Sequence, residues 1–187
     1  HIADRGDCLN LGMLTIRLTS PMEDVIRVSV RHFDGTVCRG PFARIYGTSP
    51  HTVVEETDEE IRYRSGRTTA VIDKRPNSWG IHFLDGDREL TNTGFRNMAH
   101  MTNRENGKCY MVEQLALDVD EYVYGLGERY TPFIKNGQSV AMWNEDGGTA
   151  SEITYKNIPF YITNKGYGVL LENEGDAAYE IASEKVE

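Results

Sequence analysis

Cysteine, basic charge and long apolar runs are all scarce in this sequence. Its three cysteines, Cys8, Cys38 and Cys109, are widely separated and form no CxxC pair. This pattern is typical of buried or half-buried free thiols in a reducing compartment and does not suggest a disulfide framework. We also identify no secretory hydrophobic segment at the start and no N-x-S/T sequence. We therefore expect a cytoplasmic location.

The shortage of basic and apolar residues excludes two classes of partner. The 20 Lys and Arg residues are outnumbered by 29 Asp and Glu residues, which gives a net charge of −9. A chain of this charge is a poor ligand for nucleic acid or for an anionic membrane surface. No stretch approaches the ~20 apolar residues that a membrane-spanning helix needs. We expect neither a nucleic acid nor a membrane partner.

Apolar residues recur with a period of two, which predicts strands. The 187 residues, 39% of them hydrophobic, are enough for a core without metal or disulfide support. No helical spacing of apolar residues is sustained for a dozen positions. The sequence predicts an all-β fold, an antiparallel β-sandwich of about ten strands with short turns. The clearest candidate strands lie in residues 14–19, 26–31, 61–64, 79–83 and 111–119, and residues 160–171 predict a hairpin.

Residues 125–157 interrupt this pattern. They are rich in Gly, Asn, Thr and Ser, and their aromatic residues do not alternate. This composition predicts a long ordered loop. Because long loops on a rigid scaffold are more often functional than decorative, we expect the functional residues there.

Common catalytic and metal-binding patterns are absent from the sequence. Gly125-Leu126-Gly127 lacks the third glycine of a dinucleotide-binding turn, because Tyr130 takes its place. An acidic cluster precedes Val123. A calcium-binding loop would need glycine at the position of Val123, so we interpret the cluster as a solvated strand end. The histidines have no metal-ligand spacing, and we predict no metal and no cofactor. The acidic cluster is Asp118, Asp120 and Glu121, and the histidines are His1, His32, His51, His82 and His100.

The segment Trp143–Thr149 combines an indole, amides and carboxylates in a glycine-rich turn. Aromatic faces pack on the C–H faces of sugars, and carboxylates accept hydrogen bonds from their hydroxyls, so the combination suits a carbohydrate. A purely structural role is the alternative explanation for the same residues. In that alternative Trp143 plugs the end of the sandwich and Asp146 caps a turn through backbone amides.

Five motifs in continuous order resemble the amino-terminal domain of glycoside hydrolase family 31, closest to its α-xylosidase branch. The resemblance covers about residues 120–187, and the first hundred residues resemble the family only in strand pattern. The motifs are Tyr124–Tyr130, Lys135–Gln138, Trp143–Thr149, Tyr155–Tyr161 and Gly166–Leu170.

The resemblance implies a galactose-mutarotase-like sandwich that precedes a (β/α)₈ barrel. Members of this family are retaining α-glycosidases acting on terminal α-xylosyl or α-glucosyl residues, and both catalytic carboxylates lie on the barrel. The sequence shows no alternation of strands with helices, so we expect no barrel and no catalytic residue in this chain. The resemblance makes Asp146, with Trp143 and Asn144 beside it, the candidate substrate-binding residues.

We therefore interpret residues 1–187 as the amino-terminal β-sandwich domain of a larger glycosidase, cut at both ends and inactive alone. Its partners would be a carbohydrate substrate and the missing barrel of the same polypeptide. A cut edge strand exposes unpaired backbone, which leaves a homo-oligomer open. Two alternatives remain, a stand-alone carbohydrate-binding module and a purely structural assembly domain.

Overall fold

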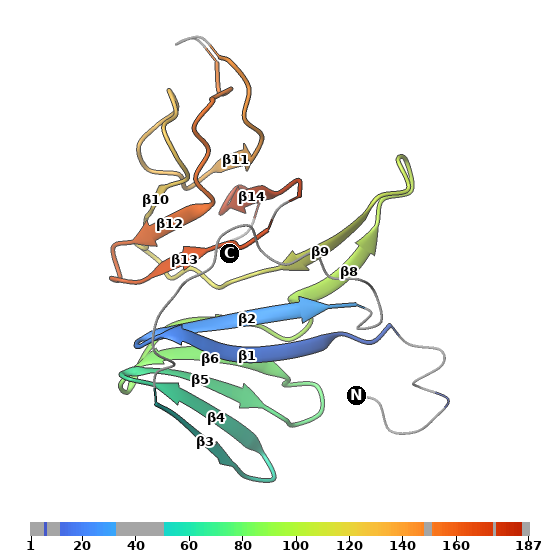
Figure 1. Cartoon of the computed structure of the whole chain (residues 1–187), viewed down its shortest axis with the longest axis vertical. Helices are drawn as coiled ribbons and strands as arrows, with labels where there is room; N and C mark the ends of the chain where they lie inside the picture. The colour runs from blue at the N-terminus through green and yellow to red at the C-terminus, as the bar shows by residue number, and fades with distance from the viewer. Residues whose placement is uncertain (1–5, 7–11, 33–50, 148–150, 174, 185–187) are drawn as a thin grey trace. The chain divides into compact units, whose positions relative to one another are not determined.

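The computed structural model describes residues 6, 12–32, 51–147, 151–173 and 175–184, and its named elements are all β-strands (Figure 1). The chain divides into two compact units, which meet in sequence between Ala116 and Leu117. Among the described residues, no helix is both long and apolar enough to cross a bilayer. Asp34-Gly35, Cys8 and Cys38 lie outside the described residues.

The first unit is built on a five-stranded antiparallel sheet of order β3-β4-β5-β6-β7. Tight turns join consecutive strands, and Gly66 and Gly86 occupy two of them with φ of 58° and 61°, a conformation that glycine adopts without strain. The strands are β3 (Thr52–Glu56), β4 (Glu60–Ser65), β5 (Thr68–Asp73), β6 (Gly80–Asp85) and β7 (Arg88–Thr93).

A hairpin of β1 (Thr15–Met22) and β2 (Val25–Arg31) lies alongside this sheet (Figure 1). Its turn is held by Asp24, whose Oδ1 accepts a hydrogen bond from the backbone N–H of Arg67 at 2.6 Å. The hydroxyl oxygens of Ser20 and Ser65 lie 2.7 Å apart. These bonds join the hairpin to the β4–β5 turn.

A further hairpin joins β8 (Met98–Thr102) to β9 (Cys109–Glu113). The predicted strand over residues 111–119 is therefore wrong beyond Glu113. The backbone N–H of Gln114 donates to the carbonyl oxygen of Asn97, and that of Ala116 donates to the carbonyl oxygen of Asn92. The chain therefore leaves the β8–β9 ladder after Glu113 and forms no continuous strand pairing there. Cys109 is a free thiol as predicted, but it is exposed and not buried.

The second unit contains the sheet β10-β12-β13 and the pair β11-β14, both antiparallel. The predicted hairpin at residues 160–171 is present as β12 and β13. The segment 125–157 is less irregular than predicted, because β11 lies inside it. The strands are β10 (Val123–Gly125), β11 (Gln138–Ala141), β12 (Phe160–Thr163), β13 (Gly168–Leu170) and β14 (Ala178–Ile181).

An apolar cluster drawn from both sheets forms the core of the second unit. Tyr161 belongs to this cluster and Tyr179 packs against it, and their rings meet edge to face with centroids 6.2 Å apart. Burial raises the pKa of both hydroxyls, that of Tyr179 to about 12. The Tyr179 hydroxyl donates to the carbonyl oxygen of Pro159 at 3.1 Å. The buried members are Val123, Leu126, Val140, Tyr161 and Ile181.

Because of these raised pKa values, we expect the unit to lose stability in alkali. A tyrosine whose pKa is higher in the folded than in the unfolded chain stabilises the fold fully below its unfolded pKa of about 10. That contribution is lost as the pH rises from about 10 through about 12, the folded value of Tyr179. Urea unfolding at pH 9 and pH 11 should show the loss, and Tyr179→Phe should show less of it. An equal loss in the variant would contradict this assignment.

Candidate functional site

The segment predicted to contact a saccharide begins where the β11–β14 ladder ends. Ala141 pairs with Ala178, and the N–H of Met142 then donates to the carbonyl oxygen of Ala177 at 2.8 Å. The next residue is Trp143. Strand pairing thus fixes the position from which its side chain projects.

The Trp143 indole points away from the core, with 63% of the residue exposed. It lines a hollow of about 360 Å³ together with Met142 and Asp176. The alternative in which this indole plugs the interior is therefore wrong. An exposed indole beside a hollow offers a flat apolar face to a ligand.

Asn157 fixes the base of the loop that carries this indole. Its side-chain amide donates to the carbonyl oxygen of Trp143 at 2.7 Å and to Oδ1 of Asn144 at 2.9 Å. The backbone N–H of Asn157 donates to the same Oδ1 at 3.0 Å. The Asn144 oxygen is thus used within the loop, and only its amide N–H groups are left for a ligand.

Asp146 is exposed and forms no hydrogen bond or ion pair with the described residues. The backbone amides that a turn at Asp146 would use include residues 148–150, which lie outside the described residues, so the turn-capping alternative stays open. The next residue must be glycine, because a Cβ on Gly147 would overlap the carbonyl oxygen of Ile153. The exposed carboxylate of Asp146 can accept hydrogen bonds from hydroxyl groups.

Arg129 joins four parts of the second unit, a role that the sequence did not indicate. Its guanidinium donates to the carbonyl oxygens of Leu126, Glu152 and Ala141 at 3.2, 3.0 and 2.7 Å, and also to Oδ1 of Asn157. Burial lowers the pKa of Arg129. Arg129 lies in the motif Tyr124–Tyr130, but its hydrogen-bond acceptors come from segments up to 28 residues away, so this role was not visible in the sequence.

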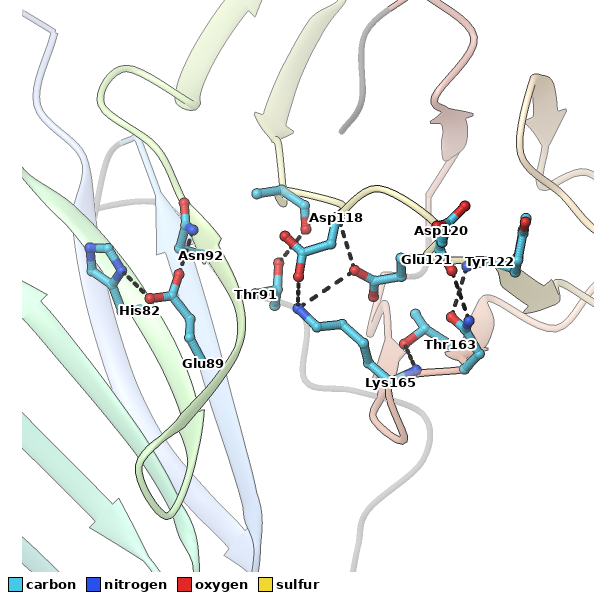
Figure 2. Close-up of polar contacts among 12 residues, drawn as sticks. His82, Glu89, Thr91, Asn92, Asp118, Asp120, Glu121, Tyr122, Thr163 and Lys165 are labelled. Carbon is cyan, nitrogen blue, oxygen red and sulfur yellow. Dashed lines mark hydrogen bonds and ion pairs between the residues drawn. The ribbon is translucent and has the colours of Figure 1, made fainter.

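The prediction of a solvated acidic cluster is correct for Asp118 and Asp120, which are exposed, but wrong for Glu121. Glu121 is 3% exposed and accepts a hydrogen bond from the backbone N–H of Asp118 at 2.9 Å. Figure 2 shows the Lys165 ammonium between them, 2.5 Å from Asp118 and 3.8 Å from Glu121. Lys165 balances the acidic charge. In the part of the chain that the structure describes, no three His, Cys, Asp or Glu side chains are placed to hold a metal ion.

Comparison with curated proteins gives relatives over the whole chain. The chain is 43% identical over 187 residues to "Alpha-xylosidase XylQ" of Lactiplantibacillus pentosus, covering 100% of this chain and 24% of the relative. It is 38% identical over 200 residues to "Alpha-xylosidase" of Emericella nidulans, covering 97% of this chain and 26% of the relative. The chain therefore spans about a quarter of the length of these proteins.

Solved structures share the fold. A Flavobacterium johnsoniae GH31 dextranase, complexed with glucose, superposes with a TM-score of 0.75 at 23% identity, covering 91% of this chain and 21% of that one. A GH31 alpha-xylosidase from a soil metagenome, complexed with xylose, gives a TM-score of 0.72 at 16% identity, with coverages of 90% and 27%.

Residues 15–180 match the family described as the glycosyl hydrolase 31 N-terminal galactose mutarotase-like domain. The predicted all-β, antiparallel, mutarotase-like fold and the resemblance noted in the sequence are both confirmed. The chain belongs to this family of glycoside hydrolase family 31 amino-terminal domains.

Proposed function

We propose that this chain is the pocket-shaping domain of a retaining α-glycosidase, an α-xylosidase, that hydrolyses terminal α-xylosyl or α-glucosyl residues. Two relatives named as α-xylosidases, at 43% and 38% identity, support this reading. The chain spans about a quarter of each, so the carboxylates that break the glycosidic bond belong to the other three quarters. This chain contributes contacts to the sugar.

Two exposed residues of the loop after β11 carry the proposal. Trp143 offers an indole face beside a hollow, and Asp146 offers a carboxylate without a partner among the described residues. A sugar can stack its C–H face on the indole and donate a hydroxyl to the carboxylate. Asn144 contributes its amide N–H groups, since its oxygen is bonded to Asn157.

The test is Asp146→Ala in the complete gene product. We expect kcat/KM for an aryl α-xyloside to fall about tenfold or more, because one charge-assisted hydrogen bond to the substrate is lost. The melting temperature should stay unchanged, since the carboxylate bonds to none of the described residues. Trp143→Ala should likewise reduce kcat/KM without unfolding the protein.

The matched control is Glu145→Ala, which removes an exposed carboxylate from the neighbouring position. The backbone N–H of Glu145 donates to the carbonyl oxygen of Thr154 at 3.0 Å, so the loop keeps its pairing in the control. We expect wild-type kinetics for Glu145→Ala. Equal kinetic losses at both positions would contradict a specific role for Asp146, and unfolding by Asp146→Ala would support the turn-capping explanation.

A stand-alone carbohydrate-binding module is the second candidate, because the hollow beside Trp143 is present on the chain itself. This candidate requires the 187-residue chain to bind xylose or an oligosaccharide at millimolar concentration or better, with loss of binding in Trp143→Ala. The proposal predicts instead that the chain alone releases no sugar from an aryl α-xyloside. We place the protein in the cytoplasm, where an exposed free thiol such as Cys109 stays reduced.

A further inference from the structure

A second hollow of the second unit, of about 400 Å³, lies against the turn that follows β10. Its aromatic lining consists of Tyr130, Phe133 and Tyr155, each more than two-thirds exposed. Its charged lining includes Arg129 and Lys135. Flat apolar faces around cationic groups suit a ligand that is apolar on one side and anionic at one end.

Both cations are held by neutral groups. Lys135 is 4% exposed, and its ammonium donates to Oγ1 of Thr131 at 3.0 Å and to the carbonyl oxygen of Pro132 at 2.8 Å. Arg129 donates to three carbonyl oxygens and one side-chain amide oxygen. Burial lowers the pKa of both, and the charge of Arg129 lowers that of Lys135 further.

No carboxylate among the described residues pairs with either cation. The nearest in sequence, that of Glu128, also lines the hollow but is engaged by Lys156 at 2.6 Å. With the described residues, the guanidinium makes four hydrogen bonds from its five N–H groups and the ammonium makes two from its three. One donor on each cation is left for a ligand. Lys135 is buried and Arg129 half-buried, and leaving such charges without an opposite charge is costly, a cost that an incoming anion reduces.

We propose that this hollow is a carboxylate-binding site in which Arg129 and Lys135 hold the carboxylate and the aromatic lining packs on the apolar part of its carrier. The carboxylate has two sources of the same chemistry, a uronic-acid residue of a saccharide or an Asp or Glu side chain from the three quarters of the relatives' length that this chain does not span. The lining of this hollow shares no residue with that of the hollow at Trp143, and the inference does not depend on the proposed function.

The probe is D-glucuronate, and D-glucose is its neutral match, because the two differ by a carboxylate in place of a hydroxymethyl group. Titration of the 187-residue chain at constant ionic strength, followed by NMR shifts of residues 125–135, should show glucuronate binding about tenfold tighter than glucose or better. Lys135→Gln should abolish the preference. Equal affinities for the two sugars, or a preference that survives Lys135→Gln, would overturn the site.

A second pair of variants keeps the test decisive if Lys135→Gln does not fold. Thr131→Asp places a carboxylate where the Thr131 hydroxyl now meets the Lys135 ammonium, and Thr131→Asn is its neutral match. We expect Thr131→Asp to melt about 3 °C or more above Thr131→Asn, because it supplies the missing charge, and to lose the glucuronate preference. A melting temperature equal to or below that of Thr131→Asn would contradict the proposal.

The complete gene product separates the two sources. If its glucuronate preference equals that of the 187-residue chain, the site is open and takes a saccharide acid. If the preference is lost there while the isolated chain keeps it, the site is filled by a carboxylate of the same polypeptide.

Discussion

Gly127→Ala is expected to destabilise the protein by about 3–5 kcal/mol, which lowers its melting temperature by about 10 °C or more. Gly127 has a φ of +92°, where a side chain is strained. A Cβ there would also overlap the carbonyl oxygen of Lys156. That oxygen already accepts a hydrogen bond from the N–H of Glu128 at 3.1 Å, so it cannot withdraw without breaking the pairing.

Gly166→Ala is the matched control for the backbone strain. Its φ of +88° is close to that of Gly127, but a Cβ would meet no atom within 4 Å. We therefore expect a loss of about 1–2 kcal/mol, the cost of the left-handed conformation alone. Urea unfolding of both variants measures the difference. Equal losses of unfolding free energy in the two variants would show that the close approach of Gly127 to the Lys156 carbonyl oxygen adds nothing to the cost of the substitution.

Local alternation predicted some of the strands, but not, for example, β3, β5 or β14. The hairpin β12–β13 follows from alternation on both sides of Asn164-Lys165-Gly166, and the predicted strand at residues 79–83 is present as part of β6. The pairing of β11 with β14 was not readable. These strands are separated by more than 35 residues, and nothing in their sequences specifies the register Gln138 to Ile181.

In the candidate site, too, local sequence predicted some features, whereas others depend on residues far away in the sequence. Residue types alone indicated that Trp143 and Asp146 suit a sugar, but their exposure depends on the bonds that Asn157 and Arg129 make at the base of the loop. Glu121 was taken for a solvent-exposed acid because its counterion, Lys165, comes 44 residues later. Local sequence reasoning therefore missed how charges are paired across the fold. For the same reason it did not show that no described carboxylate pairs with Arg129 or Lys135.

Leu126→Ala tests whether the turn that carries Arg129 is anchored by packing. Leu126 is 0% exposed within the core cluster of the second unit, although its φ is +66°. Leucine and alanine both carry a Cβ, so the backbone strain is the same in both, and the substitution isolates the buried side chain. We expect a loss of about 2–5 kcal/mol, or about 5–15 °C in melting temperature.

Leu170→Ala provides the control, because Leu170 is 52% exposed on β13 and should cost about 1 kcal/mol or less. Amide exchange of Lys135, whose N–H donates to the carbonyl oxygen of Val123 at 2.9 Å, reports on the same turn. In Leu126→Ala this exchange should accelerate with the loss of global stability, since the turn opens when its anchor is gone. If Leu126→Ala cost no more than Leu170→Ala, the turn would be held by its hydrogen bonds to Phe160 and Lys156 alone, and the position of Arg129 would not depend on the core.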